Sequence, residues 1–155
     1  MNATAESTIA LLRATRKNIQ GIYDRYSEEQ LNLVPPGFNN NLIWNAGHVI
    51  ATMELLTYGL AGLPLPAGQD FINRYRKGSK PAPRSPEGDY TLIKAGLQTS
   101  IDRLVHDLDH LDFSNFRVYP TSYGVTLSSV EDAMVFNNMH EAMHLGTMLA
   151  LRKMV

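Results

Sequence analysis

The chain has 155 residues and a formal net charge of −1, and 44% of its residues are hydrophobic while 19% are charged. This size and composition are typical of one soluble globular domain spanning residues 1–155. The near-neutral charge argues against binding to nucleic acid or to an anionic membrane. The absence of cysteine excludes disulfides, thiolate metal ligands and a cysteine nucleophile.

The N-terminal sequence lacks a basic start followed by an apolar run, and no stretch approaches about 18 uninterrupted apolar residues. Aromatic and basic residues do not interleave as they do in the stacking groove of a nucleic-acid-binding protein. We therefore expect a cytoplasmic protein that has no membrane span and that does not bind nucleic acid.

Two helices are predicted in the first part of the chain. The first covers residues 5–26, where apolar residues recur at helical spacing: Ile9, Leu12, Ile19 and Ile22. Pro35 and Pro36 then prevent the helix from continuing. The second helix covers residues 41–60 and ends near two glycines.

Two more helices are predicted in the second part. One covers residues 86–111, with apolar residues on one face: Leu97, Ile101, Leu104, Val105 and Leu108. The other runs from residue 130 towards residue 154, with Ser128 or Ser129 as its N-cap. No segment alternates with the period of two that would indicate a sheet.

The connections predict the topology. Residues 61–85, rich in proline and glycine, form the longest connection, and we expect a long ordered loop without a regular element. Such a loop can return the chain to its starting end and make the second and third helices parallel. The predicted fold is therefore all-α, a four-helix bundle of up-down-down-up topology with a long crossover between helices two and three.

His140 and His144 are the most informative residues, because their i, i+4 spacing places both imidazoles on one face of the last helix. That face is largely apolar, so both rings should point inward. On the second helix, His48 shares its face with Trp44 and is also predicted to point inward. Three inward histidines can give three nitrogens to one divalent metal, while the alternative is three hydrogen-bonded core histidines.

The predicted cofactor is a divalent metal, Zn, Ni, Fe or Mn, and imidazole ligands do not select among these ions. His106 and His110 have the same i, i+4 spacing, but they face away from the apolar side of the third helix. We interpret this second pair as surface residues.

The string from His140 to His144 also reads His-Glu-x-x-His, the pattern of zinc proteases. No Glu, Asp or His follows His144, so the downstream ligand of those enzymes is missing and a protease is disfavoured. Glu141 is a candidate acceptor behind a ligand or a general base, and the alternative is a salt bridge at the edge of the bundle. Asn137 is a candidate for orienting a ligand or substrate, and Asn45 is another.

Three segments together resemble the DinB-like superfamily, which includes metalloenzymes of the DinB/YfiT type. They are Ile43-Trp44-Asn45-Ala46-Gly47-His48, Tyr75-Arg76-Lys77-Gly78-Ser79-Lys80-Pro81 and His140-Glu141-Ala142-Met143-His144-Leu145-Gly146. The resemblance covers nearly the whole chain. It implies an up-down-down-up four-helix bundle, often a homodimer, with a divalent metal held by His48, His140 and His144. It does not imply binding to DNA.

Members of this superfamily include transferases and isomerases that use bacillithiol, mycothiol or glutathione, and others were first described as metal-dependent hydrolases. The resemblance therefore implies that the metal activates a low-molecular-weight thiol cosubstrate or water toward a small-molecule substrate. The alternative is a non-catalytic, metal-binding or structural module of a stress-response protein. Whether the chain is an enzyme is left open.

The loops at 61–85 and 113–127 are expected to form the rim of the pocket. Four of their side chains are available to an anionic cosubstrate: Arg74, Arg76, Lys77 and Tyr123. The alternative is that these side chains are solvated.

Overall fold

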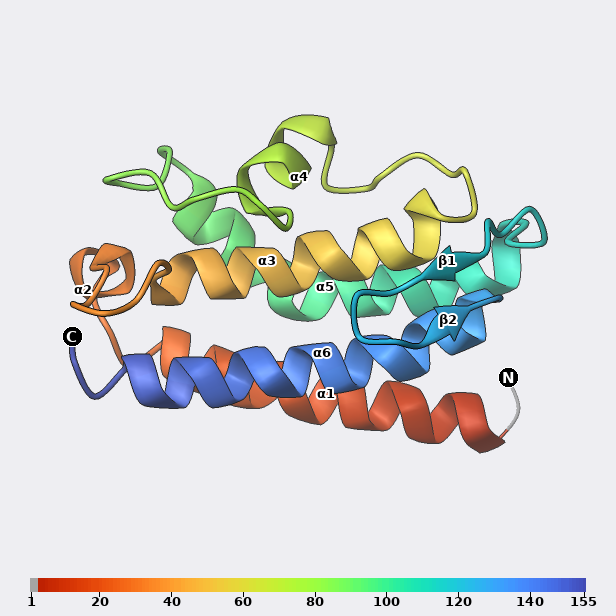
Figure 1. The fold of residues 1–155 in the computed structure, drawn as a ribbon, viewed down its shortest axis with the longest axis horizontal. Helices are drawn as coiled ribbons and strands as arrows, with labels where there is room; N and C mark the ends of the chain where they lie inside the picture. Colours follow the sequence, from red (N-terminus) through yellow and green to blue (C-terminus); the bar gives the residue numbers. More distant parts are fainter. Residues whose placement is uncertain (1–2) are drawn as a thin grey trace.

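The computed structural model describes residues 3–155 and is predominantly helical, in agreement with the all-α prediction. Four long helices dominate it (Figure 1): α1 (Ala3–Tyr23), α3 (Leu42–Glu54), α5 (Asp89–His110) and α6 (Val130–Leu151). Shorter elements join them: α2 (Glu28–Asn32), the π-helix η1 (Leu55–Gly59), α4 (Gln69–Tyr75), and the strands β1 (Tyr119–Pro120) and β2 (Thr126–Leu127).

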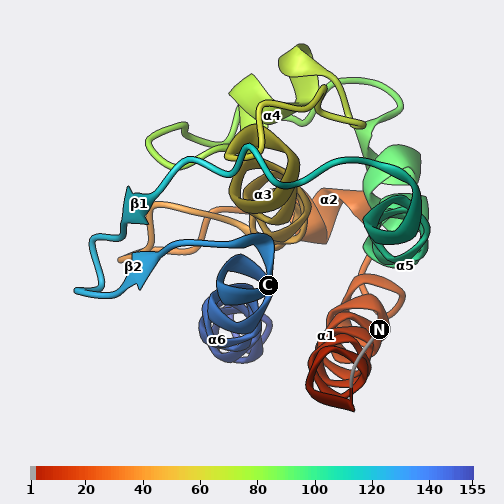
Figure 2. The ribbon, with the colours of Figure 1, turned by 90° about the vertical axis from the view of Figure 1, so that its right-hand side faces the viewer.

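The long helices enclose the hydrophobic core. Helix α1 packs against α5 and α6, and α3 packs against the same two helices, as the end-on view in Figure 2 shows. Most of the apolar positions predicted for α1 and α5 are confirmed as core residues, each 7% exposed or less: Ile9, Leu12, Ile19, Ile22, Leu97, Ile101 and Leu104. The other two predicted positions of α5, Val105 and Leu108, are only partly buried and pack against the core. Their burial follows from the helical spacing that predicted it.

Side chains fix where the two histidine-bearing helices begin. Asn41 is the N-cap of α3, because its side-chain oxygen accepts the Trp44 N–H at 2.8 Å. Ser129, one of the two predicted caps, starts α6 by accepting the Asp132 N–H at 3.2 Å. Each cap supplies an acceptor to an N–H that has no partner within the helix.

The region at 61–85 was expected to contain no regular element, and this prediction is wrong. It contains α4, whose Phe71, Ile72 and Tyr75 are buried against the core. A helix of seven residues spans only about two turns, which is too short for its periodicity to stand out between prolines. The second predicted helix also departs from regularity, because its last residues form the wider turns of η1.

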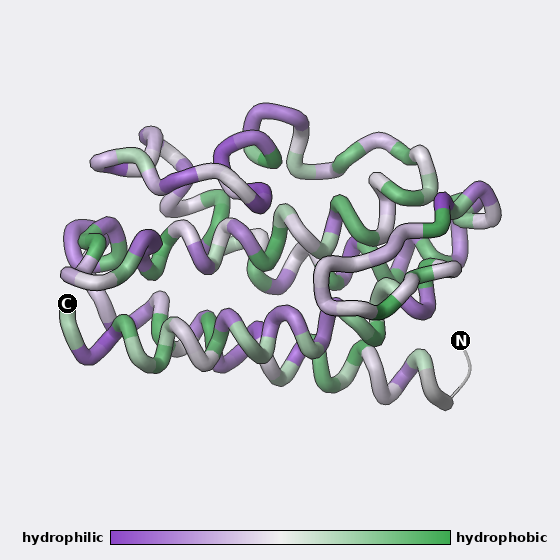
Figure 3. The backbone as a smooth tube through the Cα atoms, in the orientation of Figure 1, coloured by the Kyte–Doolittle hydropathy of each residue, from purple (hydrophilic) through white to green (hydrophobic). Residues whose placement is uncertain are grey.

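A small antiparallel hairpin closes the loop before α6, with Tyr119 opposite Leu127 and Pro120 opposite Thr126. It lies beside α3 and α6 (Figures 1 and 2). Figure 3 shows hydrophobic and hydrophilic residues alternating along the long helices, as partly buried helices require. None of the described helices is long and apolar enough to cross a membrane.

Candidate metal centre

The three histidines predicted as ligands lie together, His48 on α3 and His140 and His144 on α6. The ring centroids of His48 and His140 are 5.2 Å apart, and His144 lies 4.6 Å from each of the other two. Each residue offers one nitrogen within 4.8 Å of the others. The predicted convergence of these histidines is therefore confirmed, and such a cluster can hold a metal ion.

The ring of His48 is held by α4 and by its own helix. Its Nδ1–H donates to the Tyr75 carbonyl oxygen at 2.6 Å, and the Trp44 ring stacks on it with centroids 4.6 Å apart. Gly47 allows α4 to come this close, because a Cβ at that position would lie 2.5 Å from the Tyr75 ring. The hydrogen bond fixes the tautomer and leaves the lone pair on Nε2.

Asn45 orients His144 across the gap between α3 and α6. The Nδ1–H of His144 donates to Asn45 Oδ1 at 2.8 Å, while Asn45 Nδ2 donates to the Asn41 carbonyl at 2.7 Å. Because the amide nitrogen is committed to Asn41, the amide oxygen must face the imidazole. Asn45 thus orients one of the proposed metal ligands, and that ligand is His144.

The environment favours the neutral, metal-binding form of all three imidazoles. Burial is the main factor that lowers the pKa of His140 to about 3 and that of His144 to about 4; His48 adds to the shift in both, and His144 adds to that of His140. Burial also lowers the pKa of His48. In addition, Nδ1 of His140 is buried and has no hydrogen-bond partner among residues 3–155.

Arg16 forms a buried cluster directly behind the histidines. Its guanidinium pairs with the Glu141 carboxylate at 2.5 and 2.8 Å, and both side chains are 0% exposed. The remaining N–H groups donate to the carbonyls of Val49 at 3.0 Å and Leu97 at 3.2 Å and to Ser100 Oγ at 3.3 Å. One side chain from α1 therefore contacts α3, α5 and α6.

The position of this ion pair links it to the histidines. Val49 follows His48 in the sequence, and Glu141 follows His140. By holding Val49 and Glu141, Arg16 fixes the separation of α3 and α6 at the level of the histidines. Removing one partner of a buried pair leaves an uncompensated charge and costs about 3–5 kcal/mol.

Glu141 thus takes part in a salt bridge, as the alternative interpretation held, but in the core instead of at the bundle edge. Asn137 supports this carboxylate, because its Nδ2 donates to Glu141 Oε1 at 2.8 Å. Asn137 Oδ1 is buried without a hydrogen-bond partner in the described chain. Both oxygens of Glu141 are engaged, so the side chain is not poised as a base.

Thr52 is a polar group at the centre that the sequence interpretation left without a role. Its hydroxyl donates a hydrogen bond of 3.2 Å to Nε2 of His48, the nitrogen that a metal would take over. Thr52 lies one turn after His48 and is half-buried. A hydroxyl in this place can hydrogen-bond to a group that approaches beside His48.

The two loops expected to form the rim meet at Lys77, whose ammonium donates to Ser122 Oγ at 3.1 Å. The Lys77 charge also reaches the site, since after burial it is among the factors that lower the pKa values of His48 and His140. Tyr123 is 61% exposed and lies edge-on to Phe136 of α6, with ring centroids 6.4 Å apart. Arg76 is exposed.

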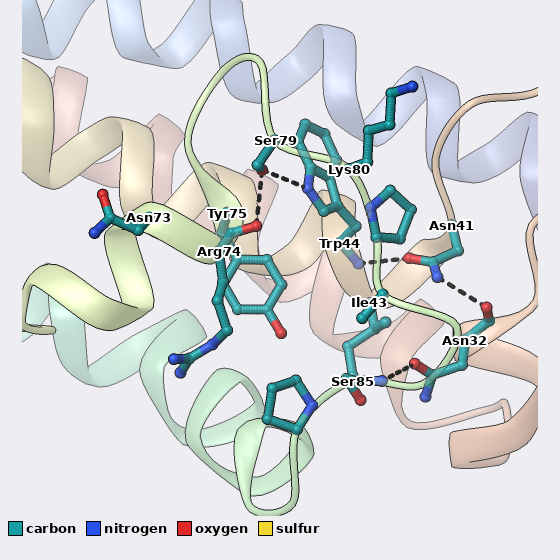
Figure 4. Close-up of a pocket in the computed structure, with 13 residues that line it drawn as sticks. Asn32, Asn41, Ile43, Trp44, Asn73, Arg74, Tyr75, Ser79, Lys80 and Ser85 are labelled. Carbon is teal, nitrogen blue, oxygen red and sulfur yellow. Dashed lines mark hydrogen bonds between the residues drawn. The ribbon is translucent and has the colours of Figure 1, made fainter.

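Arg74 forms an ion pair with Asp89 of α5 and not with a residue of the histidine cluster. Its guanidinium makes two hydrogen bonds to the Asp89 carboxylate, at 2.8 and 2.9 Å, and Tyr75 OH donates to the same group at 2.7 Å. Figure 4 shows Arg74 and Tyr75 lining a pocket of about 140 Å³, in which Trp44 Nε1 donates to Ser79 Oγ at 3.0 Å. Trp44 thus separates this small pocket from His48.

His106 and His110 are exposed, so the prediction that they are surface residues is confirmed. Their rings stack 4.0 Å apart, and the Nδ1–H of His110 donates to the His106 carbonyl at 2.6 Å. The described structure adds no third ligand to this pair.

The sequence did carry a signal for Arg16. Leu12, Arg16, Ile19 and Tyr23 follow helical spacing, so the arginine lies within the apolar stripe of α1. An arginine in such a stripe requires a buried acidic partner, and Glu141 on the inward side of α6 is a candidate. The contact between the Tyr75 carbonyl and His48 left no such signal, because a backbone oxygen has no sequence identity.

Comparison with known proteins identifies the family of the chain. A family model of the DinB superfamily matches residues 11–148, which include all three histidines and Arg16. A comparison with curated proteins gave no significant match. Because the family match covers most of its length, the chain belongs to the DinB superfamily.

Proposed function

We propose that the chain is a metal-dependent enzyme in which His48, His140 and His144 hold a divalent metal, Zn, Ni, Fe or Mn. The proposal rests on the convergence of three imidazoles, two of which donate Nδ1–H to a protein oxygen. Nε2 of these two rings then carries the lone pair that binds a cation. Three protein nitrogens leave a coordination position for a substrate, as catalytic zinc sites require.

The donor set fits such an ion. Two nitrogens that bind one zinc ion at about 2.0–2.1 Å lie no more than about 4.2 Å apart. The three ligand atoms already lie within 4.8 Å of one another, so small side-chain rotations suffice. The lowered pKa values of His140 and His144 keep these rings unprotonated near neutral pH, as metal binding requires.

When bound, the metal would supply a positive charge that lowers the pKa of a thiol or water beside it. The chain's own residues would orient the reactants. Thr52 can donate a hydrogen bond next to His48, and Trp44 shields one face of that ring from solvent. Lys77 can pair with a carboxylate of the incoming molecule, while Arg74 is already engaged by Asp89.

A small thiol is the cosubstrate that this arrangement supports best. Both oxygens of Glu141 are engaged, so it is not available to take a proton from water. A thiol ionises much more readily than water and needs less help from a base. Because the chain has no cysteine, the thiol must come from a cosubstrate. We therefore propose thiol-dependent S-transfer first and hydrolysis second.

The same engaged Glu141 favours the alternative, a non-catalytic metal-binding module in which the metal only joins α3 to α6. A structural zinc site, however, takes four ligands from the protein, whereas the cluster found in the described residues has three. The distinction is therefore whether a thiol can reach the metal.

We also propose that the long helices form an up-down-down-up four-helix bundle. In support, α1 and α6 run in one direction along the molecule while α3 and α5 run in the other (Figure 1). We further propose a homodimer, because α6 exposes three apolar side chains: Val135 (55%), Met143 (45%) and Leu149 (39%).

The first experiment measures metal content by plasma mass spectrometry on untagged protein, with His48→Ala and His140→Ala as variants. We expect about one metal per chain in the wild type and loss of metal in both variants. His106→Ala is the matched control and should keep the metal. Wild-type protein that stays free of metal after reconstitution with zinc, nickel and manganese would refute the proposal.

The second experiment separates the enzyme from the module. Protein reconstituted with cobalt is titrated with glutathione, and the thiolate-to-cobalt charge-transfer band is recorded. A band that grows with thiol and disappears in His140→Ala supports thiol access. A cobalt spectrum unchanged by thiol supports the closed, structural site.

A further inference from the structure

A second pocket lies on the side of α3 away from the histidines. It has a volume of about 270 Å³, and α3, α4, α5 and the segment before α4 enclose it. Glu54 follows His48 by six residues and is turned from it by about 240° around the helix. The pocket is therefore separate from the metal centre. Figure 2 shows the hairpin and α6 on one side of α3, while α5 lies on a different side.

Glu54 places a buried carboxylate in this pocket. The residue is only 2% exposed, and Oε2 accepts the Ala67 N–H at 2.8 Å. No hydrogen bond to Oε1 is present within residues 3–155. Burial raises the pKa of Glu54, which reflects the cost of a charge that is incompletely compensated. The hydrogen bond from Ala67 anchors the segment before α4, but it engages only Oε2 of the Glu54 carboxylate.

In the part of the chain that the structure describes, no cationic side chain forms an ion pair with this carboxylate. Arg16, which also attracts Glu54 electrostatically, is paired with Glu141. Arg103 lines the pocket and attracts Glu54 electrostatically, yet it has no carboxylate within ion-pair distance in the described chain. The pocket thus has a buried acceptor on its wall and an unpaired guanidinium at its exposed side.

The remaining walls are mainly apolar. Ile50 and Phe71 are 3% and 6% exposed and form the inner wall, while Leu92 is 60% exposed at the entrance. Small residues of α5, including Gly96, leave the space open. The volume lies just below the range of about 300–1,000 Å³ that is typical of ligand pockets, so the ligand must be small.

We propose that this pocket binds a small zwitterion of the apolar amino-acid type, whose ammonium group pairs with Glu54, whose carboxylate pairs with Arg103, and whose side chain packs on Ile50, Phe71 and Leu92. A simple amine would satisfy Glu54 but would meet repulsion from Arg103. A simple carboxylate would satisfy Arg103 and be repelled by Glu54. Opposite charges on one ligand match both groups.

The test is a titration of the whole protein with L-phenylalanine, followed by amide shifts in ¹H–¹⁵N NMR spectra. We expect saturable shifts at Ala67, Gly96 and Thr99, which line the pocket. Glu54→Gln keeps the shape and can still accept the Ala67 N–H, and it should weaken binding by roughly 10- to 100-fold, as expected for a lost charge-assisted hydrogen bond. Arg103→Gln should weaken binding by roughly threefold to tenfold, because its pair is exposed.

Two comparison ligands and one control variant complete the test. 2-Phenylethylamine and 3-phenylpropionate each lack one charge and should both bind more weakly than L-phenylalanine. The exposed Glu87→Gln should leave the affinity unchanged. Glu54→Gln with wild-type affinity, or 3-phenylpropionate binding as well as L-phenylalanine, would overturn the proposal. Metal content in Glu54→Gln should equal that of the wild type, so this proposal and the metal proposal fail independently.

Discussion

Two pairs of histidines share i, i+4 spacing in this molecule but differ in everything around them. His140 and His144 on α6 face α3, which adds His48 and the orienting amide of Asn45. His106 and His110 on α5 face solvent and stack on each other. The comparison shows that spacing only brings two nitrogens to one face of a helix. A third nitrogen, burial and fixed tautomers must come from the tertiary structure.

The largest expected effect comes from removing the support behind the buried pair. Arg16→Met leaves the Glu141 carboxylate unpaired in the core and should lower the free energy of unfolding by about 3–5 kcal/mol. Urea denaturation measures this difference. Adding Glu141→Leu should restore part of the stability, because the second substitution removes the unpaired charge.

Arg13→Met is the matched control for Arg16→Met, since Arg13 pairs with Asp102 at the surface, where their side chains are 40% and 61% exposed. It should cost no more than about 1 kcal/mol. Equal losses in Arg13→Met and Arg16→Met would mean that burial of the Glu141 pair is not important for stability.

Next in size is the direct comparison of the two pairs. His140→Ala removes one of three proposed ligands, and we expect the affinity for zinc to fall by more than about 100-fold. This exceeds the loss expected when only a residue hydrogen-bonded to a ligand is removed. His106→Ala should change the affinity less than about twofold and stability by no more than about 0.5 kcal/mol. Competition with a chromophoric chelator measures both. A greater loss of zinc affinity in His106→Ala than in His140→Ala would mean that the metal binds at the exposed pair and not at the buried one.

The orienting contact should have a smaller effect. Asn45→Ala removes the acceptor for the Nδ1–H of His144 while all three imidazoles remain, and zinc affinity should fall by about 10- to 100-fold. Asn45→Asp, which keeps an oxygen toward His144, should recover part of the loss. If Asn45→Ala binds zinc like the wild type, the tautomer is not fixed by this contact.

The last effect builds up gradually with pH and concerns protein from which metal has been stripped. Burial depresses the pKa of His140 to about 3 and of His144 to about 4 in the folded state. The unfolded chain therefore binds more protons below about pH 6.5, and stability falls as the pH decreases from there toward pH 4. Each histidine contributes up to about 1.4 kcal/mol per pH unit.

Thermal unfolding at several pH values measures this slope, and His140→Gln should reduce it. A slope that is the same in His140→Gln and in the wild type would show that His140 does not take up a proton on unfolding.

Much of the fold could be predicted from the sequence because it depends on long, regular patterns. Apolar residues at helical spacing identified α1 and α5, and the outward direction of His106 and His110 followed from the same periodicity. Helix α4 could not be recognised, because two turns between prolines carry too little pattern. The hairpin strands have two residues each and carry even less.

The histidines of the candidate site could be predicted from the sequence, but the hydrogen bonds that hold them in place could not. The helix face on which His48, His140 and His144 lie follows from their positions in the sequence. The roles of Glu141 and Asn45 depend on which residues of other helices they meet, and that requires the packing. The Tyr75 carbonyl could not be inferred at all, because every residue has one.

The contacts of Arg16 have a consequence for how the chain folds. Its hydrogen bonds reach α3, α5 and α6 from α1, so a form that lacks any one of these helices leaves part of the guanidinium or Glu141 without partners. Partly assembled forms are thereby penalised relative to the complete structure. Arg16 should therefore make folding more cooperative, and amide hydrogens in the middle of all four helices should exchange through one common opening.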